Sequence, residues 1–272
     1  MASADQVLLT INNKPRAILQ TMDGLLAKRN TQAEQAGRRR WLPFLLFLAG
    51  VPCIALDFVF NYTTCFFSFV TASLWAAAIV TFIIWTRGKP GAQFSPHYFT
   101  VRQVIDTLRD DLAPKQNLLG KLDLTGARQP SKLARSGKGL HNAKLDFYRD
   151  EWLSLKAKLY DGNVLRLSAI ERVKVKEGMF RRGRSGKMKW KSEKIENGQQ
   201  IKVRLAVNPQ AYELMHHVQM STQIGQYFVD GFSANDGILE LTAASVAKTI
   251  KPEDILGVLK FVYDQLERKG QK

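Results

Sequence analysis

The sequence has few of the residues on which several protein classes depend. Only two of the 272 residues are cysteines, Cys53 and Cys65, and they form no CxxC pair. This excludes a disulfide framework and a thiolate zinc site, and it fits a reducing compartment. The four histidines show no metal-ligand spacing: His97, His141, His216 and His217. We therefore expect no metal and no cofactor.

The motifs of common catalytic classes are also missing. The chain has no GxSxG, no P-loop, no GxGxxG and no HExxH. Three acids, Asp146, Asp150 and Glu151, cluster just before Trp152, but clustered acids in a loop are weak evidence for a reaction. A hydrolase whose acids and lysine are scattered over a sheet stays an alternative. We expect a protein that is not an enzyme.

Acidic residues are scarce beside basic ones, 24 against 40, so the formal net charge is +16. The imbalance is concentrated after residue 86, where 33 basic residues face 20 acidic ones. A domain of this charge is attracted to anionic lipid, nucleic acid or phosphorylated ligands.

Charge is almost absent between residues 41 and 85. Two apolar runs, 41–60 and 66–85, contain one charged residue, Asp57, and only 61–65 separates them. At 1.5 Å per residue each run spans about 30 Å, the thickness of a hydrocarbon core. Backbone groups in lipid must be satisfied internally. The runs therefore predict a two-helix transmembrane hairpin, with a buried hairpin in a globular protein as the alternative.

The flanking charges orient this predicted hairpin. Arginines 38–40 precede it, Arg87 and Lys89 follow it, and the connection contains no basic residue. The positive-inside rule then places both termini in the cytoplasm, in a cell membrane that we expect to be a bacterial inner membrane. Small residues four apart predict close helix packing within the hairpin or between protomers: Ala72, Ser73, Ala76 and Ala77.

The segments on either side of the hairpin are less regular. Residues 1–40 form an N-terminal cytoplasmic segment, either an amphipathic helix starting at Pro15 or a partly ordered tail. Residues 86–150 contain a linker, a helix from Ser95-Pro96 to about Leu112, a strand at 121–125 and a basic loop at 126–142.

Residues 151–272 predict a cytoplasmic α+β domain. Asp161-Gly162 predicts a hairpin between strands 152–160 and 163–177, and Asn197-Gly198 predicts one between strands 187–196 and 199–207. A helix at 209–220, a strand at 238–247 and a covering helix at 252–268 follow. The expected class is α+β, with a mostly antiparallel sheet and helices on one side.

The most distinctive part of this domain is a basic hairpin. Alternation places Arg172, Lys174 and Lys176 on one face of a strand, and Lys187, Lys189 and Lys191 on one face of the next. If the strands are in register, these six cations line one side of a two-stranded ribbon. The loop at 178–186 adds Arg181, Arg182 and Arg184 around an apolar tip, Met179 and Phe180.

An apolar tip ringed by arginines suits insertion among anionic headgroups. The alternatives are a plain solvated face, nucleic acid or a protein partner. Nucleic acid is not favoured, because the ribbon lacks interleaved surface aromatics. We expect a membrane-anchored, non-catalytic scaffold or sensor whose basic domain binds an anionic surface or partner within an oligomer or complex. The alternative is a ligand-gated membrane effector or pore-forming subunit whose hairpins assemble when ligand binds.

Overall fold

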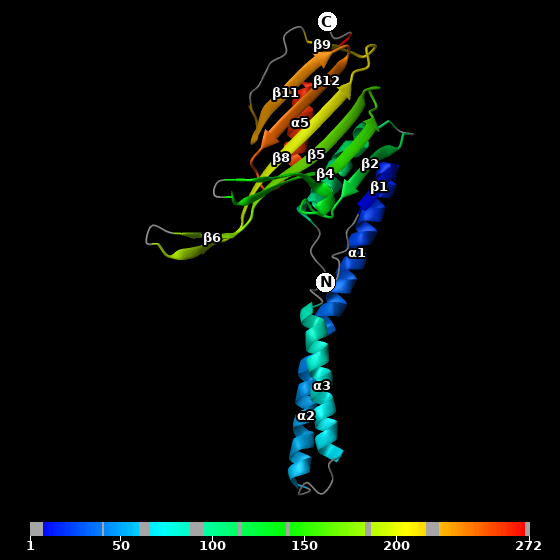
Figure 1. Ribbon diagram of the computed structural model, residues 1–272. Coiled ribbons are helices and arrows are strands. Elements are labelled where there is room, and N and C mark those ends of the chain that lie inside the picture. Colours follow the sequence, from blue (N-terminus) through cyan, green and yellow to red (C-terminus); the bar gives the residue numbers. More distant parts are fainter. Residues whose placement is uncertain are drawn as a thin grey trace. The chain divides into compact units, whose positions relative to one another are not determined.

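The computed structural model describes residues 8–39, 41–59, 66–87, 95–113, 116–139, 142–182, 186–215 and 223–269. The chain divides into two compact units (Figure 1). One comprises residues 1–4 and 21–93, and the other residues 5–20 and 94–272. Helix α1 (Pro15–Arg39) therefore begins in the second unit and ends in the first.

The first unit contains helices α2 (Leu42–Val59) and α3 (Phe66–Arg87), which pack against each other. Phe47 stacks on Trp75, with ring centroids 5.2 Å apart. Gly50 allows this approach, because a Cβ there would lie 2.8 Å from Cδ1 of Trp75. The small residues that we expected at the helix contact, Ala72, Ser73, Ala76 and Ala77, are exposed. Their exposure places them outside the contact between α2 and α3, and packing between protomers stays a prediction.

The prediction of a transmembrane hairpin is wrong, and with it the predicted integral membrane localisation. Among the residues that the structure describes, no helix is long and apolar enough to cross a membrane. The described side chains of the two runs cover 41–52 and 68–83. The side chain of Asp57 and the connection at 61–65 lie outside the described parts.

The second unit is built on a nine-stranded antiparallel sheet. Its outer strands are β1 (Leu8–Asn13) and β2 (Leu118–Asp123) on one side, and β12 (Ile238–Ser245), β11 (Tyr227–Asn235) and β10 (Gln223–Ile224) on the other. The long central strands are β4 (Lys144–Lys158), β5 (Val164–Lys176) and β8 (Lys194–Ala206), and β3 (Leu133–Lys138) also pairs with β4.

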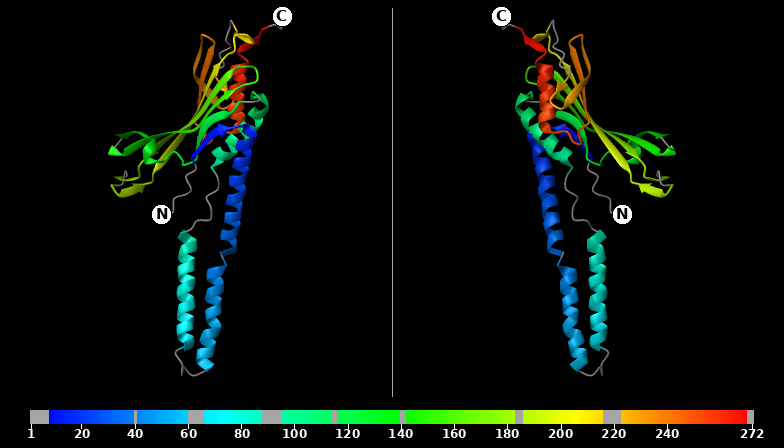
Figure 2. Two further views of the ribbon diagram at one scale, coloured as in Figure 1. Left: turned by 90° about the vertical axis from the view of Figure 1, so that its right-hand side faces the viewer. Right: turned by 90° about the vertical axis from the view of Figure 1, so that its left-hand side faces the viewer.

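Helices α4 (Pro96–Leu108) and α5 (Pro252–Tyr263) lie on one face of this sheet (Figure 2). The Ser95 hydroxyl accepts a hydrogen bond from the His97 amide, so the predicted N-cap is confirmed. Both helices bury a complete apolar stripe, which includes Val104 and Ile105 of α4 and Val258 of α5. The core thus lies between these two helices and the sheet.

Short elements complete the second unit. They are the 3₁₀ helices η1 (Arg109–Asp111) and η2 (Pro130–Lys132), the pair β9 (Tyr212–Leu214) and β13 (Leu266–Arg268), and the pair β6 (Met179–Arg182) and β7 (Met188–Lys191).

The predicted hairpin at Asp161-Gly162 is confirmed, and Gly162 supplies a positive φ of 88°. The predicted turn at Asn197-Gly198 is wrong. Both residues lie inside β8, opposite Val173 and Arg172 of β5. The chain reverses earlier, through β6 and β7, because β8 pairs with the whole length of β5.

Two predicted helices also need correction. Residues 212–214 of the helix predicted at 209–220 form strand β9, and 216–222 lie outside the described residues. The C-terminal helix ends at Tyr263 rather than Arg268, because residues 266–268 pair with β9. The predicted basic loop at 126–142 contains η2 and the strand β3.

Candidate anion-binding face and arm

Strands β4, β5 and β8 continue beyond the part of the sheet that the helices cover (Figure 2). We call this part the extension: residues 144–150 of β4, 171–176 of β5 and 194–198 of β8, with β3 paired to its edge. From its end projects the arm, the two-stranded hairpin of β6 and β7 (Figure 1). The described residues between β3 and β8 contain no α-helix, so no local helix covers the extension as α4 and α5 cover the core.

The two faces of the sheet differ sharply in charge. Odd-numbered residues of β5 face the helices, and Leu165, Leu167 and Val173 are all buried. Even-numbered residues point to the opposite side, which we call the outer face. The register keeps β8 in phase with β5, whereas an extra residue at Trp152 shifts the phase of β4.

Ten basic side chains of β4, β5 and β8 lie on the outer face, against two acidic ones, Glu151 and Glu196. The basic residues are Arg149, Lys156, Lys158, Arg166, Arg172, Lys174, Lys176, Lys194, Lys202 and Arg204. Like charges on adjacent strands repel one another. Such a concentration therefore favours an anionic partner that neutralises it.

Few of these charges are neutralised within the chain. Lys174 pairs with Glu196 at 2.8 Å, and its hydrogen bond and charge hold the pKa of that carboxyl below its usual value. Arg204 pairs with Glu240 of β12 at 3.1 Å. Arg172 donates to the Gln200 Oε1 at 2.8 Å. Among the described residues, none of the other seven basic side chains on this face forms an ion pair.

A small hollow lies where the arm joins the extension, and we call it the cationic niche. Its volume is about 170 Å³, and it is lined by four basic side chains, Lys176, Arg181, Lys191 and Lys194, with Ser192, Met179 and Glu177. It is smaller than the pockets of roughly 300–1,000 Å³ that enclose drug-sized ligands. Its size and its donors suit one phosphate group, since ammonium, guanidinium and hydroxyl groups all donate to phosphate oxygens.

The arm does not have the geometry expected from the sequence. We predicted that Arg172, Lys174 and Lys176 face Lys187, Lys189 and Lys191 across one ribbon. The register instead sets Lys174 opposite Glu196 and Lys176 opposite Lys194. Within the arm, Arg181 faces Lys189, and Met179 faces Lys191. The predicted six-cation ribbon is therefore wrong, because β5 pairs with β8 while β7 pairs with β6.

The apolar residues of the arm also lie elsewhere than predicted. Met179 and Phe180 are in strand β6, at the base of the arm, and not at the tip of a loop. Phe180 lies opposite Trp190, with ring centroids 5.0 Å apart, and the two residues are 62% and 58% exposed. Lys187 is exposed, and Arg184 lies outside the described residues.

The face of the extension opposite the outer face is closed by the loop at 124–132. Ala127 of this loop packs with Val173, Val175 and Tyr148. Lys132 fixes the loop, because its Nζ lies 2.7 Å from Asp150 Oδ1 and 3.1 Å from Asp123 Oδ2, and it donates to the Gly126 carbonyl at 3.1 Å. The ammonium group thus contacts three oxygen atoms, two of which belong to carboxylates.

The two carboxyls of this cluster have opposite pKa shifts. Burial raises the pKa of Asp150, which is only 2% exposed, and this outweighs the effect of Lys132. Burial also acts to raise the pKa of Asp123, but hydrogen bonds from Thr125 and Lys132 outweigh it and hold that pKa below its usual value. Lys132 and its partners therefore form a structural clamp.

The acids that we considered for catalysis do not converge. Asp146 accepts from Ser136 at 2.5 Å and pairs with Lys144 at 3.0 Å, whereas Asp150 pairs with Lys132. Glu151 lies on the outer face. In the described part of the chain, no group of three or more His, Cys, Asp or Glu residues is placed to hold a metal ion.

Sequence reasoning placed Phe180 at an exposed tip but missed the exposure of Trp190. Alternation along 187–191 placed Trp190 opposite the lysines, as on a half-buried strand, because it assumed that the strand belongs to the main sheet. The signal that it overlooked was Gly178. A Cβ there would lie 2.7 Å from Cζ2 of Trp190, so this glycine permits the close approach of the ring.

No protein-family model matches the chain, and comparisons with curated proteins and with solved structures found no match.

Proposed function

We propose that this protein is a non-catalytic binding protein or scaffold, which holds a phosphate-bearing anionic partner against its outer face and cationic niche. The observation that supports this most is the excess of ten cations over two acids on one face of three adjacent strands. The niche adds a concave site at the end of that face, with four basic side chains around about 170 Å³.

The arrangement favours an extended partner over a small ligand. The basic residues are distributed along the strands from Lys158 to Lys176, and the niche alone is too small for a whole cofactor. A surface of this kind binds through many weak charge-assisted contacts and attracts its partner from a distance, so affinity falls steeply with salt.

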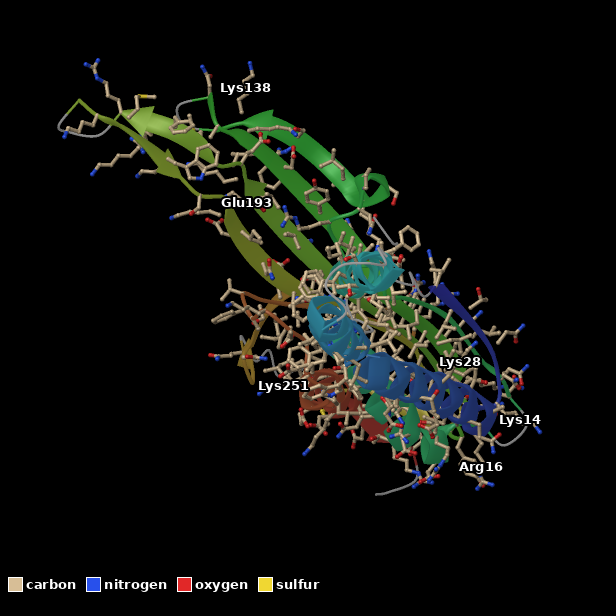
Figure 3. The ribbon with its side chains drawn as sticks, turned by 90° about the horizontal axis from the view of Figure 1, so that it is seen from below. Lys14, Arg16, Lys28, Lys138, Glu193 and Lys251 are labelled. Atoms are coloured by element: carbon tan, nitrogen blue, oxygen red, sulfur yellow. The ribbon has the colours of Figure 1, made fainter. Side chains whose placement is uncertain are left out.

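Figure 3 shows Lys138, at the end of β3, directed away from the sheet at the same end of the molecule as Glu193.

Retention of the full chain on immobilised heparin, a sulfated polyanion, tests the proposal. Lys176→Gln combined with Lys194→Gln removes two niche cations, and we expect elution at clearly lower salt. The matched control is Lys248→Gln with Lys260→Gln, two exposed lysines outside the three strands of the outer face. Equal elution of both variants would contradict the proposal.

The expected self-association, or membership in a complex, stays a prediction that the oligomeric state in solution will test. The alternative of a pore-forming effector required hairpins that cross a membrane, so we do not retain it.

A further inference from the structure

We infer that the anionic partner is a single-stranded nucleic acid, whose bases stack on the arm while its phosphates bind the niche and the outer face. This inference rests on the proposed function and names its partner. It starts from the exposed pair Phe180 and Trp190, which the sequence alone did not bring together.

The register assigns the side chains of the arm to two opposite faces. Directly opposed residues of an antiparallel pair point to the same side. Arg181, Lys189, Lys191 and Met179 therefore share one face, and the other holds Phe180, Trp190, Met188 and Arg182. Because Arg181, Lys191 and Met179 line the niche, the aromatic pair lies on the face opposite to it.

A basic and aromatic surface suits either a membrane or a nucleic acid, and the placement of the rings opposite the niche distinguishes between these two partners. A bilayer surface is nearly flat on the scale of a hairpin, so it meets one face of the arm at a time. With the niche against headgroups, Phe180 and Trp190 point away from the membrane. A single nucleic acid strand is flexible, and the two strands of the arm are only about 4.8 Å apart. It can pass over the edge of the arm and bind both faces.

The ring geometry suits stacking. Phe180 and Trp190 meet edge to face at an interplanar angle of 63°, and both side chains are more than half exposed, so each ring keeps a surface that a base can contact. Bases stack on such rings whatever their identity, because every base has a π face. Arg182 lies on the same face of the arm and is exposed, and its guanidinium group can stack on a base or pair with a phosphate.

A third aromatic ring lies among the cations of the outer face. Phe147 is half-buried, Arg135 lies over its ring at 4.6 Å from the centroid, and Lys174 is its partner on β5. A strand that passes over the edge of the arm would thus meet cations and an aromatic ring on the outer face, and the aromatic pair on the other side, the combination typical of single-strand binding surfaces. We therefore expect tolerance of base sequence and strong dependence on salt.

Fluorescence anisotropy of a labelled oligothymidylate with the full chain tests the inference. We expect Trp190→Ala and Phe180→Ala each to weaken binding about tenfold, as loss of one stacked base does. Trp190→Phe keeps a ring and should restore most of the affinity, and it guards against a folding defect of the alanine variant. Trp41→Ala, which removes another exposed tryptophan, is the matched control and should bind as wild type does.

The same assay with the niche variant measures the phosphate part of the binding. Lys176→Gln combined with Lys194→Gln should lower the slope of log K against log salt by about 0.7 for each phosphate that these lysines neutralise in the wild type.

Three results would overturn the inference. The first is that Trp190→Ala and Phe180→Ala leave the affinity for oligothymidylate unchanged, while the niche variant still elutes from heparin at lower salt. The proposed function would then stand, and the inference of a single-stranded nucleic acid would fall. The second is tighter binding to the matching duplex. The third is binding to phosphatidylglycerol vesicles that depends on Trp190 where oligothymidylate binding does not, which would identify a membrane surface as the partner.

Discussion

The same three strands are stabilised in two different ways along their length. In the covered part of the sheet, Leu167, Val203 and Leu205 lie under α4 and α5, and each is at most 1% exposed. In the extension, Val173 and Val175 lie under the loop at 124–132, which contributes the small buried side chain of Ala127. The helices therefore stabilise the covered part, whereas the extension is held under the loop by the packing of Ala127 and by the Lys132 clamp, and its other face is open for binding.

The largest loss of stability is expected from a substitution in the covered part of the sheet. Leu167→Ala leaves a cavity in a fully buried position, so we expect a loss of about 3 kcal/mol in the free energy of unfolding. Val175→Ala, in the extension, should lose no more than about 1.5 kcal/mol because fewer atoms are removed and the site can relax. Urea denaturation of both variants measures the difference. Equal losses would mean that the two parts are equally well packed.

Breaking the clamp should have the next largest effect. Lys132→Met leaves Asp150 and Asp123 without their cation, and loss of one partner from a buried ion pair costs about 3 kcal/mol. The loss should be smaller near pH 4, where protonation of the carboxyls removes their uncompensated charge. Lys156→Met, at an exposed lysine of β4, is the control and should change little. Thermal unfolding at several pH values provides the measurement, and a loss independent of pH would argue against the clamp.

A smaller effect on the pH dependence of stability is expected from the substitution of Asp150 alone. Its pKa is raised in the folded state, so the folded chain binds more protons than the unfolded chain between the two pKa values. Stability due to this group is therefore present at low pH and is lost as pH rises from about 4 through the folded pKa. Asp150→Asn removes this dependence, so its stability relative to wild type should rise over that window. A relative stability that falls over the same window would show that ionised Asp150 stabilises the extension.

The smallest effect on stability is expected in the arm. Gly178→Ala places a Cβ 2.7 Å from Cζ2 of Trp190 and 3.0 Å from the Lys191 carbonyl, so the ring must move. Because the arm projects from the end of the extension, away from the helices, the free energy of unfolding should change by less than about 0.5 kcal/mol. Oligothymidylate affinity should nevertheless fall. A large drop in the unfolding midpoint would show that the arm belongs to the cooperative core.

The sequence predicted those features that local chemistry determines. Asp161-Gly162 gave a hairpin because the turn requires a positive φ, and Ser95-Pro96 gave a helix start. The alternation of Arg172, Val173 and Lys174 correctly assigned their faces.

Features that depend on pairing across the chain were not predictable in this way. Asn197-Gly198 has the composition of a turn, but pairing with β5 keeps it extended. The exposure of Trp190 depends on β7 leaving the main sheet, which no short pattern reveals. The apolar runs at 41–60 and 66–85 predicted helices correctly, but not the setting in which those helices lie.

Trp152 of β4 has no partner in the register with β5, and this affects which side chains of the strand point inward. Even-numbered residues before it and odd-numbered residues after it face the helix side. The alternation of inward and outward side chains along β4 therefore changes phase by one residue at Trp152. Deleting Glu151 or Trp152 would remove this change of phase. If the pairing after Leu153 were kept, every side chain of β4 before the deletion would point to the opposite face of the sheet. Phe147 and Arg149 would then point inward, and Tyr148 and Asp150 would point to the solvent.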